Sequence, residues 1–566
     1  MVKHIRNSDA DIMPVINFKY EDLCSLIGEK VPQQTLIQRI PLIGADMHDT
    51  EGNEDEMSVE FFPDRPDLFS VEGLARGMRA FLDIKPGMQE YDVKKTDIVV
   101  TADESVRNIR PYFLCAAVFD VNISDEFLRS MMELQEKLHI TIGRKRNKFA
   151  IGIHDLDKVQ APFTYTTVKP DEVRFVPLAK TESMTMAEIL TEHEKGVDYA
   201  HLLKGLDRYP VIFDKNKNVL SFPPIINGAL TTVTTNTHNL FIDVTGNDRK
   251  AVKGALDIVV TALAERGGKI GSVLMKGTEE CISPDLSVEK YVISVKECDK
   301  FIGVDLGSEG IIEALRRMEM NAFVDSEDTD AVHVCIPSTR LDIMHKADIF
   351  EDVAIGYGFD KFGGSYKLNQ TMGHLSADTT FSESMRDIMI GLGFTEVTTL
   401  TLSNDREEFQ ISGLPEMQNV RVTNPITEEH TCLRSYLMPS LMRILRHNKH
   451  RDLPQKIFEV GYVIRDNKVV LHLCALATAS KTSFTEIKSI AESVLRETST
   501  KYSLSPCDYS TFIDGRGAFV NIEGKDAGLF GEVSPKVVVD FEITHPVIML
   551  ELDLTPIILT KANSLF

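Results

Sequence analysis

Apolar and polar residues alternate near the N-terminus in runs that are typical of a small mixed domain. The run Val15–Phe18 predicts a strand, because β-branched and aromatic residues favour extended backbone. A helix is expected from about Val71 to Leu82, where Ser70 can cap the first turn. We therefore expect residues 13–86 to form an N-terminal domain.

A longer mixed region follows at residues 100–275. Its pattern predicts a strand at 112–121, a helix at 125–142 and a second long helix at 248–267. Turn-rich β segments lie between the two helices. The combination predicts a domain in which helices cover a sheet.

Residues 285–362 have the pattern of a small separate domain. The strand Tyr291–Val295 and the helix Ile311–Met318 follow one another in a βαβ-like order. The apolar strand Val332–Ile336 and an acidic helix near Asp348–Ile355 close the segment.

Residues 370–566 form a last α/β block in this pattern. Helices are expected near 380–392, 435–450 and 484–498, with several strands between them. Taken together, the pattern predicts a multidomain protein that combines α/β and α+β architecture.

Length and composition agree with several folded domains. The chain has 566 residues, and at roughly 150 residues per domain this predicts about four domains. Hydrophobic residues make up 43% and charged residues 26%, which excludes a disordered or collagen-like protein. Residues 1–12 are polar, so we expect them to form an extension, unless the chain starts at Met13.

The net charge of −23 argues against non-specific binding to nucleic acid or acidic membranes, because such binding needs a basic surface. It leaves room for a local basic groove. The eight cysteines are scattered singly, as is typical of reduced cytosolic thiols. No apolar run approaches the roughly 18 residues that a membrane span needs. We therefore expect a soluble, cytoplasmic protein that does not bind membranes.

The sharpest acidic cluster consists of Asp342, Asp348, Glu351 and Asp352. The last three stand at i, i+3 and i+4, so they share one face of the predicted helix. Carboxylates suit Mg²⁺, and a bound cation would offset their mutual repulsion. The alternative is a solvated acidic first turn, which the helix dipole favours. The spacing alone leaves both open.

A second cluster combines turn signals with a polar strand. The double proline at 223–224 predicts an extended segment, and Asn227-Gly228 is a strong signal for a hairpin turn. Asp243 and Thr245 alternate on one face of a strand, where they could line a polar pocket. The alternative is turn chemistry without a ligand.

Seven ordered segments carry a resemblance to a known family. They are FPDRPDLFSVEGLARG (62–77), AIGIHDLD (150–157), SFPPIINGALTTV (221–233), DVTGNDR (243–249), STRLDIMHKADIFEDVAIGYGFDK (338–361), TNPITEEHTCLRSYLMPSLMRILRHN (423–448) and PQKIFEVGYVI (454–464). Their order and spacing resemble the β subunit of phenylalanine–tRNA ligase of the archaeal and eukaryotic type, over nearly the whole chain from Met13.

The resemblance implies an N-terminal domain, an editing domain, a small winged-helix-like domain and a class II synthetase-like antiparallel-sheet domain that lacks the catalytic motifs. It also implies an α₂β₂ heterotetramer in which the α subunit binds ATP and phenylalanine and charges tRNA(Phe). The β chain would support that reaction and hydrolyse misacylated tyrosyl-tRNA(Phe). The alternative is a non-catalytic scaffold that binds tRNA or assists assembly and has lost editing.

Carried over residue by residue, the resemblance places Mg²⁺ on Asp342, Asp348, Glu351 and Asp352. It places the editing pocket in the region 100–275, and our candidates are Ser221, Pro224, Asn227, Gly228, Asp243 and Thr245. Tyrosine is phenylalanine plus one hydroxyl, which an apolar pocket rejects only weakly. A second pocket that hydrogen-bonds this hydroxyl would exclude phenylalanine, because polar groups would then stay unpaired.

The last block departs from the catalytic class II pattern. The strand that ends at Arg465 is similar to the first half of the ATP-binding hairpin, but its loop is cut short at 466–468. No Gly-rich arginine segment follows the strand 546–553. We therefore expect this chain to contain no catalytic residues for aminoacylation.

Basic residues of the same block recur at near-helical spacing, namely Arg443, Arg446, His447, His450 and Arg451. They could form a solvated helix face, or they could contact tRNA phosphate or an acidic patch of the α subunit.

Overall fold

The computed structural model describes residues 14–48, 50, 55–277, 280–364 and 372–558. The expected extension at residues 1–12 lies outside the described residues. By their internal contacts the residues group into two compact units, 1–366 and 367–566.

The first unit begins with a three-stranded antiparallel sheet and three helices. The strands, in sheet order, are β1 (Val15–Lys19), β3 (Glu56–Phe61) and β2 (Ala45–His48). The helices are α1 (Tyr20–Ile27), α2 (Gln33–Arg39) and α3 (Val71–Phe81). Ser70 accepts a hydrogen bond from the backbone N–H of Gly73 at 3.2 Å, which confirms the predicted cap of α3.

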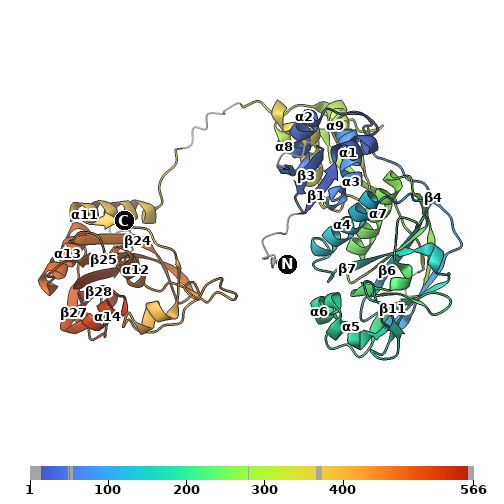
Figure 1. The fold of residues 1–566 in the computed structure, drawn as a ribbon. Helices are drawn as coiled ribbons and strands as arrows, with labels where there is room; N and C mark the ends of the chain where they lie inside the picture. Colours follow the sequence, from blue (N-terminus) through green and yellow to red (C-terminus); the bar gives the residue numbers. More distant parts are fainter. Residues whose placement is uncertain (1–13, 49, 51–54, 278–279, 365–371, 559–566) are drawn as a thin grey trace. The chain divides into compact units, whose positions relative to one another are not determined.

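A five-stranded sheet with two long helices forms the centre of this unit. In sheet order its strands are β4 (Val93–Lys94), β15 (Lys269–Gly271), β6 (Tyr112–Phe119), β14 (Leu240–Gly246) and β7 (Phe149–Asp155). Helices α4 (Asp125–Ile140) and α7 (Arg249–Glu265) lie side by side against it (Figure 1). Ile242 and Val244 of β14 pack into the core with these helices, so Asp243, between them, faces the other way.

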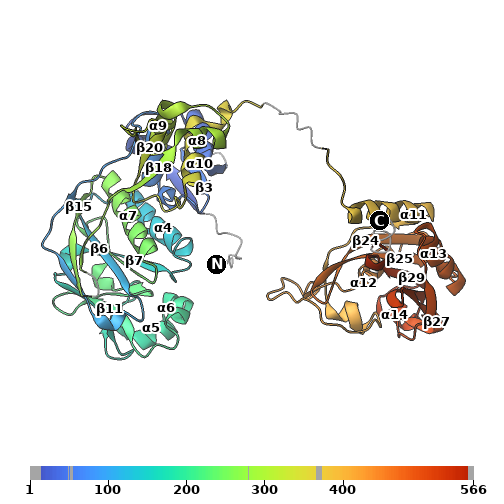
Figure 2. The ribbon, with the colours of Figure 1, turned by 180° about the vertical axis from the view of Figure 1, so that it is seen from behind.

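A seven-stranded sheet lies beside the five-stranded one. In sheet order its strands are β13 (Ile226–Asn227), β12 (Val219–Phe222), β11 (Tyr209–Phe213), β8 (Phe163–Val168), β5 (Val99–Ala102), β16 (Val273–Gly277) and β17 (Cys281–Ser283). Helices α5 (Met186–Glu192) and α6 (Glu194–Tyr199), and the short pair β9 (Arg174–Phe175) and β10 (Met184–Thr185), cover the β11–β12 end; α5 and α6 are seen there in Figure 2.

The hairpin β12–β13 differs from its prediction. Ser221 pairs with Asn227 and Phe222 pairs with Ile226, so residues 223–225 form the turn. The double proline therefore lies in the turn and is not extended, since proline has no N–H to give to a sheet ladder. Asn227 belongs to a strand, and Asn227-Gly228 is not the hairpin turn.

A further small, three-stranded sheet with three helices completes the first unit. Strand β20 (Ala331–Ile336) lies between β18 (Glu289–Ser294) and β19 (Asn321–Val324) and pairs antiparallel with both. The helices are α8 (Val295–Ile302), α9 (Gly307–Arg317) and α10 (Lys346–Tyr357). The βαβ-like order exists along the chain, but β18 and β19 are not neighbours, because the hairpin β19–β20 inserts its second strand between them.

The second unit is a seven-stranded, mostly antiparallel sheet between two pairs of helices. In sheet order its strands are β21 (Thr395–Glu396), β24 (Gln455–Arg465), β25 (Lys468–Thr478), β29 (Val547–Asp553), β28 (Lys525–Val533), β27 (Phe512–Ile522) and β26 (Ser503–Pro506). A separate two-stranded sheet consists of β22 (Leu402–Ser403) and β23 (Cys432–Leu433).

Alternation along the strands of the second unit explains its layers. Leu473 and Ala475 of β25 share a core with α11 (Ala377–Gly391) and α13 (Phe484–Glu497). Cys474 and Leu476 share another core with α12 (Met438–His447) and α14 (Pro535–Asp540). Helix α12 ends at His447, so it is shorter than the predicted helix at 435–450.

Candidate functional site

A pocket of about 570 Å³ lies where the edge strands of the two larger sheets meet. Edge strand β7 lines one side, through residues 150–153, and the turn of the β12–β13 hairpin lines another. Helix α4 and the start of α6 complete the wall. This volume falls within the range that small ligands use, roughly 300–1,000 Å³.

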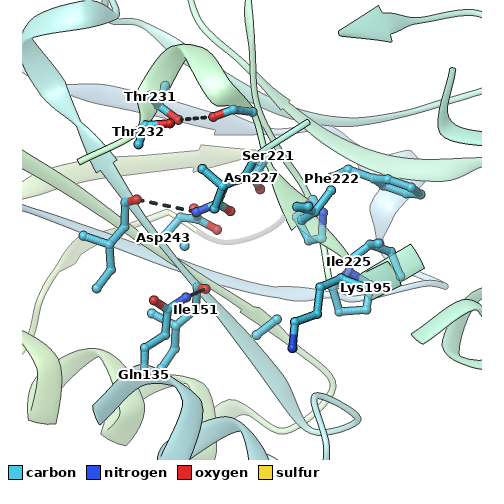
Figure 3. Close-up of a pocket in the computed structure, with 18 of the residues that line it drawn as sticks. Gln135, Ile151, Lys195, Ser221, Phe222, Ile225, Asn227, Thr231, Thr232 and Asp243 are labelled. Atoms are coloured by element: carbon cyan, nitrogen blue, oxygen red, sulfur yellow. Dashed lines mark hydrogen bonds between the residues drawn. The ribbon is translucent and has the colours of Figure 1, made fainter. Parts of the chain in front are cut away.

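A few buried polar groups stand in a largely apolar wall. Ser221 and Asp243 line the pocket although only 3% and 1% of each residue is exposed. Asn227 lines it too, and its amide nitrogen lies 3.5 Å from the carbonyl oxygen of Ile153. Figure 3 shows Ser221, Asn227 and Asp243 in one part of the pocket and Lys195 in another. Such a wall suits a ligand with an apolar body and one polar end.

Five of the six predicted pocket residues line this cavity: Ser221, Pro224, Asn227, Gly228 and Asp243. Thr245 does not line it. It lies two residues beyond Asp243 on β14, fully buried, where its hydroxyl oxygen is 3.4 Å from Nε of Arg110. Arg110 also donates to the carbonyl oxygen of Thr245 at 2.8 Å.

Helix α4 and the loop after it supply three polar pocket residues that the sequence analysis missed, Gln135, Glu136 and Arg146. Gln135 donates to the carbonyl oxygen of Ile151 at 2.7 Å (Figure 3). Arg146 donates to the carbonyl oxygen of Ile225 at 2.8 Å and to Glu136 at 3.1 Å, so it ties the hairpin turn to α4. The only signal for Arg146 in the sequence was its place in a basic run, which is usually a solvated feature.

His139 lies behind this wall, next to Glu136, which is part of the wall. Burial lowers the pKa of His139 to about 4, so the ring is neutral. Its Nε2 accepts the backbone N–H of Ile151 at 2.8 Å, which leaves the proton on Nδ1, 3.5 Å from Glu136. The hydrogen bond from His139, together with Arg146, holds the pKa of Glu136 at about 2. Glu136 is therefore a carboxylate at neutral pH.

The pocket carboxylate Asp243 has a buried partner on the neighbouring strand. His154 on β7 lies with Nε2 2.7 Å from Oδ2 of Asp243 and Nδ1 2.8 Å from the hydroxyl oxygen of Thr231. His154 is fully buried and does not line the pocket itself. The sequence analysis quoted the segment that contains His154 but assigned the residue no role.

The predicted magnesium ligands are divided between two environments. Arg340 donates to Asp342 and to Asp352, each at 2.6 Å, so one guanidinium serves both carboxylates. Burial raises the pKa of Asp352 to about 6 even with Arg340 beside it. An arginine between two carboxylates occupies the place that a shared cation would take.

The other two predicted ligands lie on the exposed side of α10. Asp348 caps the helix, since it accepts the backbone N–H groups of Met344 and His345 at 2.8 and 2.7 Å. Glu351 is exposed. Throughout the described residues, no three histidine, cysteine, aspartate or glutamate side chains are placed to share a metal ion. As they lie, the four carboxylates do not fit one Mg²⁺ ion, and magnesium at these positions stays a prediction.

A minimal turn joins the strands of the β24–β25 hairpin. Strand β24 is the one that the sequence analysis found similar to the first half of a class II ATP-binding hairpin. Arg465 pairs with Lys468, so only Asp466 and Asn467 lie between the strands, both with left-handed backbone (φ 50° and 58°). The Arg465 guanidinium donates to the carbonyl oxygen of Ser435 and lies 4.5 Å from the ring centre of Tyr436. This arginine is bound to its own domain.

Two of the basic residues on α12 have a buried acidic partner. Arg443 donates to Glu407 at 3.0 Å, and Arg446 lies 3.6 Å from the same carboxylate. Glu407 is 6% exposed. The buried carboxylate of Glu407 thus offsets part of the positive charge on α12. These contacts support a structural role for Arg443 and Arg446 within their own domain. In the part of the chain that the structure describes, no helix is both long and apolar enough to span a membrane.

Known proteins with similar sequences cover nearly the whole chain. A phenylalanine–tRNA ligase beta subunit from Methanothrix thermoacetophila is 43% identical over 544 residues, which cover 96% of this chain and 100% of that protein. This chain belongs to the phenylalanine–tRNA ligase beta subunit family. A second member, from Archaeoglobus fulgidus, is 43% identical over 547 residues and 96% of this chain, and is itself covered to 98%.

Family models match three parts of this beta-subunit chain. Residues 127–259 match the B3/4 domain, residues 291–359 match the tRNA synthetase B5 domain, and residues 366–554 match the phenylalanyl tRNA synthetase beta chain CLM domain. The pocket residues from Gln135 to Asp243 fall within the B3/4 match. The four predicted magnesium ligands fall within the B5 match.

A solved structure agrees with the fold of the first unit. An N-terminal fragment of the phenylalanyl-tRNA synthetase beta subunit from Pyrococcus horikoshii has a TM-score of 0.59 to this chain at 39% identity. It covers 61% of this chain and is itself covered completely.

Proposed function

We propose that this chain is the β subunit of an α₂β₂ phenylalanine–tRNA ligase and hydrolyses misacylated tyrosyl-tRNA(Phe) in the pocket between β7 and the β12–β13 hairpin. The α subunit binds ATP and phenylalanine and attaches phenylalanine to tRNA(Phe), and this chain supports that reaction. Membership of the beta subunit family supports the assembly role. The buried polar groups of the pocket carry the editing role.

Recognition of tyrosine rests on its phenolic hydroxyl. Asp243 is the acceptor for the phenolic O–H, with Ser221 and Asn227 as further hydrogen-bonding groups in the same pocket. Phenylalanine in this pocket would leave the buried Asp243 without that partner, which costs affinity. A site built to bind a hydroxyl in this way can reject the analogue that lacks it by large factors.

Hydrolysis uses a water molecule as the nucleophile. Among the five candidates that line the pocket, Ser221 alone carries a hydroxyl, and as a nucleophile it would need an adjacent base. His193 lines the pocket, but its ring nitrogens are bound to the backbone of Leu178 and Lys195. His154 lies behind the wall, and its nitrogens are bound to Thr231 and Asp243. The pocket therefore binds and orients the tyrosyl group, while water and a hydroxyl of the tRNA act at the ester bond.

Magnesium, tRNA and cellular location belong to the same proposal. Mg²⁺ accompanies ATP at the α subunit, and Asp342, Asp348, Glu351 and Asp352 are the candidates for a further ion in this chain. Nothing in the editing step depends on that ion. All eight cysteines lie in the described part of the chain and none forms a disulfide there, which supports a cytoplasmic location, where thiols are kept reduced.

The test is hydrolysis of tyrosyl-tRNA(Phe) by the complex of this chain with its α subunit. Asp243→Ala should slow hydrolysis strongly while phenylalanylation of tRNA(Phe) keeps its rate. Thr245→Ala, beside the pocket but outside its wall, should have a smaller effect. Undiminished hydrolysis by Asp243→Ala would refute the pocket assignment. A wild-type complex that charges tRNA but hydrolyses no tyrosyl-tRNA would favour the alternative, a scaffold that has lost editing.

A further inference from the structure

We infer that His154 is a positioning residue for tyrosine recognition: it holds the Asp243 carboxylate in the orientation that accepts the phenolic hydroxyl. The inference rests on the proposed function, and it adds a residue that lies behind the pocket wall. Three observations support it: the hydrogen bond of His154 to Asp243, its hydrogen bond to Thr231, and the space that Gly152 leaves between His154 and Asp243.

His154 connects Asp243 to a second part of the pocket wall. Its Nε2 lies 2.7 Å from Asp243 Oδ2, and its Nδ1 lies 2.8 Å from the hydroxyl oxygen of Thr231. Thr231 lines the pocket, and its hydroxyl oxygen also lies 3.2 Å from the carbonyl oxygen of Gly228. The ring therefore bridges the strand that carries Asp243 and the segment after the β12–β13 hairpin, and it orients Asp243 from behind.

The proton on Nε2 follows from the partner. An ionised carboxylate only accepts hydrogen bonds, so Nε2 of His154 donates to Asp243. A carboxylate that accepts from a fixed imidazole loses rotational freedom before any ligand arrives. His154 is fully buried, with its ring centre 6.4 Å from that of Phe241, and hydrogen bonds on both nitrogens hold the ring in place.

Gly152 leaves the space in which this contact forms. It pairs with Asp243 across strands β7 and β14 and lines the pocket. A Cβ atom at residue 152 would lie 2.1 Å from Oδ2 of Asp243 and 2.7 Å from Nε2 of His154. Any side chain there would displace the carboxylate from the imidazole. Glycine is thus needed at this position for contact between the other two residues.

His154 does not touch the ligand. It is absent from the pocket wall, whereas Asp243 and Thr231 are part of it. Its effect reaches the ligand through Asp243, so it should act on the discrimination between tyrosine and phenylalanine. A purely structural histidine would affect hydrolysis of both aminoacyl-tRNAs alike.

The test compares His154→Phe, which keeps an aromatic ring and removes both hydrogen bonds, with His154→Gln, which keeps a donor. Both are assayed in the complex with the α subunit, on tyrosyl-tRNA(Phe) and phenylalanyl-tRNA(Phe). We expect kcat/KM for tyrosyl-tRNA to fall roughly 10- to 100-fold in His154→Phe, since small misplacements of a binding group cost that much. Slow hydrolysis of phenylalanyl-tRNA should be unchanged, and His154→Gln should retain more activity than His154→Phe.

Two further variants separate positioning from loss of folding. Gly152→Ala keeps both His154 and Asp243 in the sequence but forces their side chains apart, so it should reproduce the loss seen in His154→Phe. In an Asp243→Ala background, His154→Phe should add less than about twofold, because the group that it positions is gone. Charging of tRNA(Phe) and the thermal midpoint of each complex report on folding and assembly.

Three results would overturn the inference: wild-type discrimination in His154→Phe, equal losses for the two aminoacyl-tRNAs, or a full additional loss on top of Asp243→Ala. If Asp243→Ala abolishes editing and His154→Phe does not, only the inference fails. If Asp243→Ala itself leaves editing intact, the proposed function fails as well.

Discussion

The guanidinium of Arg76 and the carboxylate of Glu319 lie 2.6 Å apart and buried, although 243 positions of sequence separate them. The pair joins α3 to the segment between α9 and β19. Arg65 extends this pair into a network, because its guanidinium lies 2.8 Å from Asp67 and 3.5 Å from Glu319. Burial alone would raise the pKa of Asp67, but Arg65 outweighs it and holds this pKa at about 2.

Removing one partner of this pair should be costly. Arg76→Met leaves Glu319 as a buried carboxylate without its main partner, and we expect a loss of about 3–5 kcal/mol in the free energy of unfolding of the first unit. The double variant with Glu319→Met should be more stable than the single one, because no charge is left unpaired. Urea unfolding measures both. The exposed pair Lys19–Glu126, 3.0 Å apart, is the control, and Lys19→Met should change little. Equal stability of Arg76→Met and wild type would contradict the prediction.

The stability of the second unit should depend on the protonation of Glu408. Burial raises the pKa of this fully buried carboxyl group from 4.5 to about 7, although it accepts the N–H groups of Ser435 and Tyr436. The folded state therefore keeps a proton that the unfolded state releases above pH 4.5. The free energy of unfolding should fall by roughly 3 kcal/mol between pH 4.5 and 7 on account of this group.

Glu408→Gln measures that contribution. Glutamine cannot ionise and can still accept both backbone hydrogen bonds. The variant should lose little stability at pH 4.5 and should be more stable than wild type at pH 7.5, as judged from its urea midpoint. Parallel pH profiles of the two proteins would show that Glu408 does not titrate in this range.

The predicted magnesium site competes with an arginine. Arg340 neutralises Asp342 and Asp352, so Mg²⁺ can use all four carboxylates only after this guanidinium gives way. We expect Arg340→Gln to bind Mg²⁺ more tightly than wild type in isothermal titration calorimetry. Adding Asp342→Asn to this variant should remove the gain, and circular dichroism checks that it folds. No binding heat in either protein would disprove a magnesium site at these residues.

This chain alone should form no aminoacyl-adenylate. The two-residue turn at 466–467 leaves no loop to enclose a nucleotide, and Arg465 is held by Ser435 and Tyr436. The electrostatic stabilisation that adenylation needs is therefore missing. Phenylalanine-dependent exchange of pyrophosphate into ATP should be absent with the purified chain and present with the α₂β₂ complex. Exchange by the chain alone would contradict this prediction.

Local elements were the part of the fold that the sequence predicted best. Helix α3 runs from Val71 to Phe81, one residue short of its predicted end, and Ser70 accepts the backbone N–H of Gly73 at 3.2 Å, as its predicted cap. These elements depend on side-chain periodicity and on caps within four residues, which are local physical signals. The β12–β13 turn was misplaced because Asn227-Gly228 is the stronger local turn signal and the double proline was read as extended; only strand pairing shows that residues 223–225 form the turn.

The sequence analysis identified pocket residues on β12, β13 and β14, but it did not identify the residues on other elements that contact this part of the wall. Ser221, Asn227 and Asp243 stood near turn signals or alternated along one strand, so their faces could be inferred. Gln135 and His154 lie on another helix and another strand, and their contacts depend on which strands become neighbours.

By itself, the sequence determined the elements, the family and the polar residues that one strand can present to a pocket, because periodicity, caps and ordered motifs act over short distances along the chain. Tertiary structure decided which of those residues meet. It placed Gly152 opposite Asp243, brought His154 within hydrogen-bond distance of the same carboxylate, and set Arg340 between two of the predicted metal ligands. The contacts of Asp243 depend on sheet register, which joins residues about 90 positions apart and leaves no pattern within either segment alone. The contacts of Arg340 are closer in sequence, but they depend on how the loop before α10 packs against that helix.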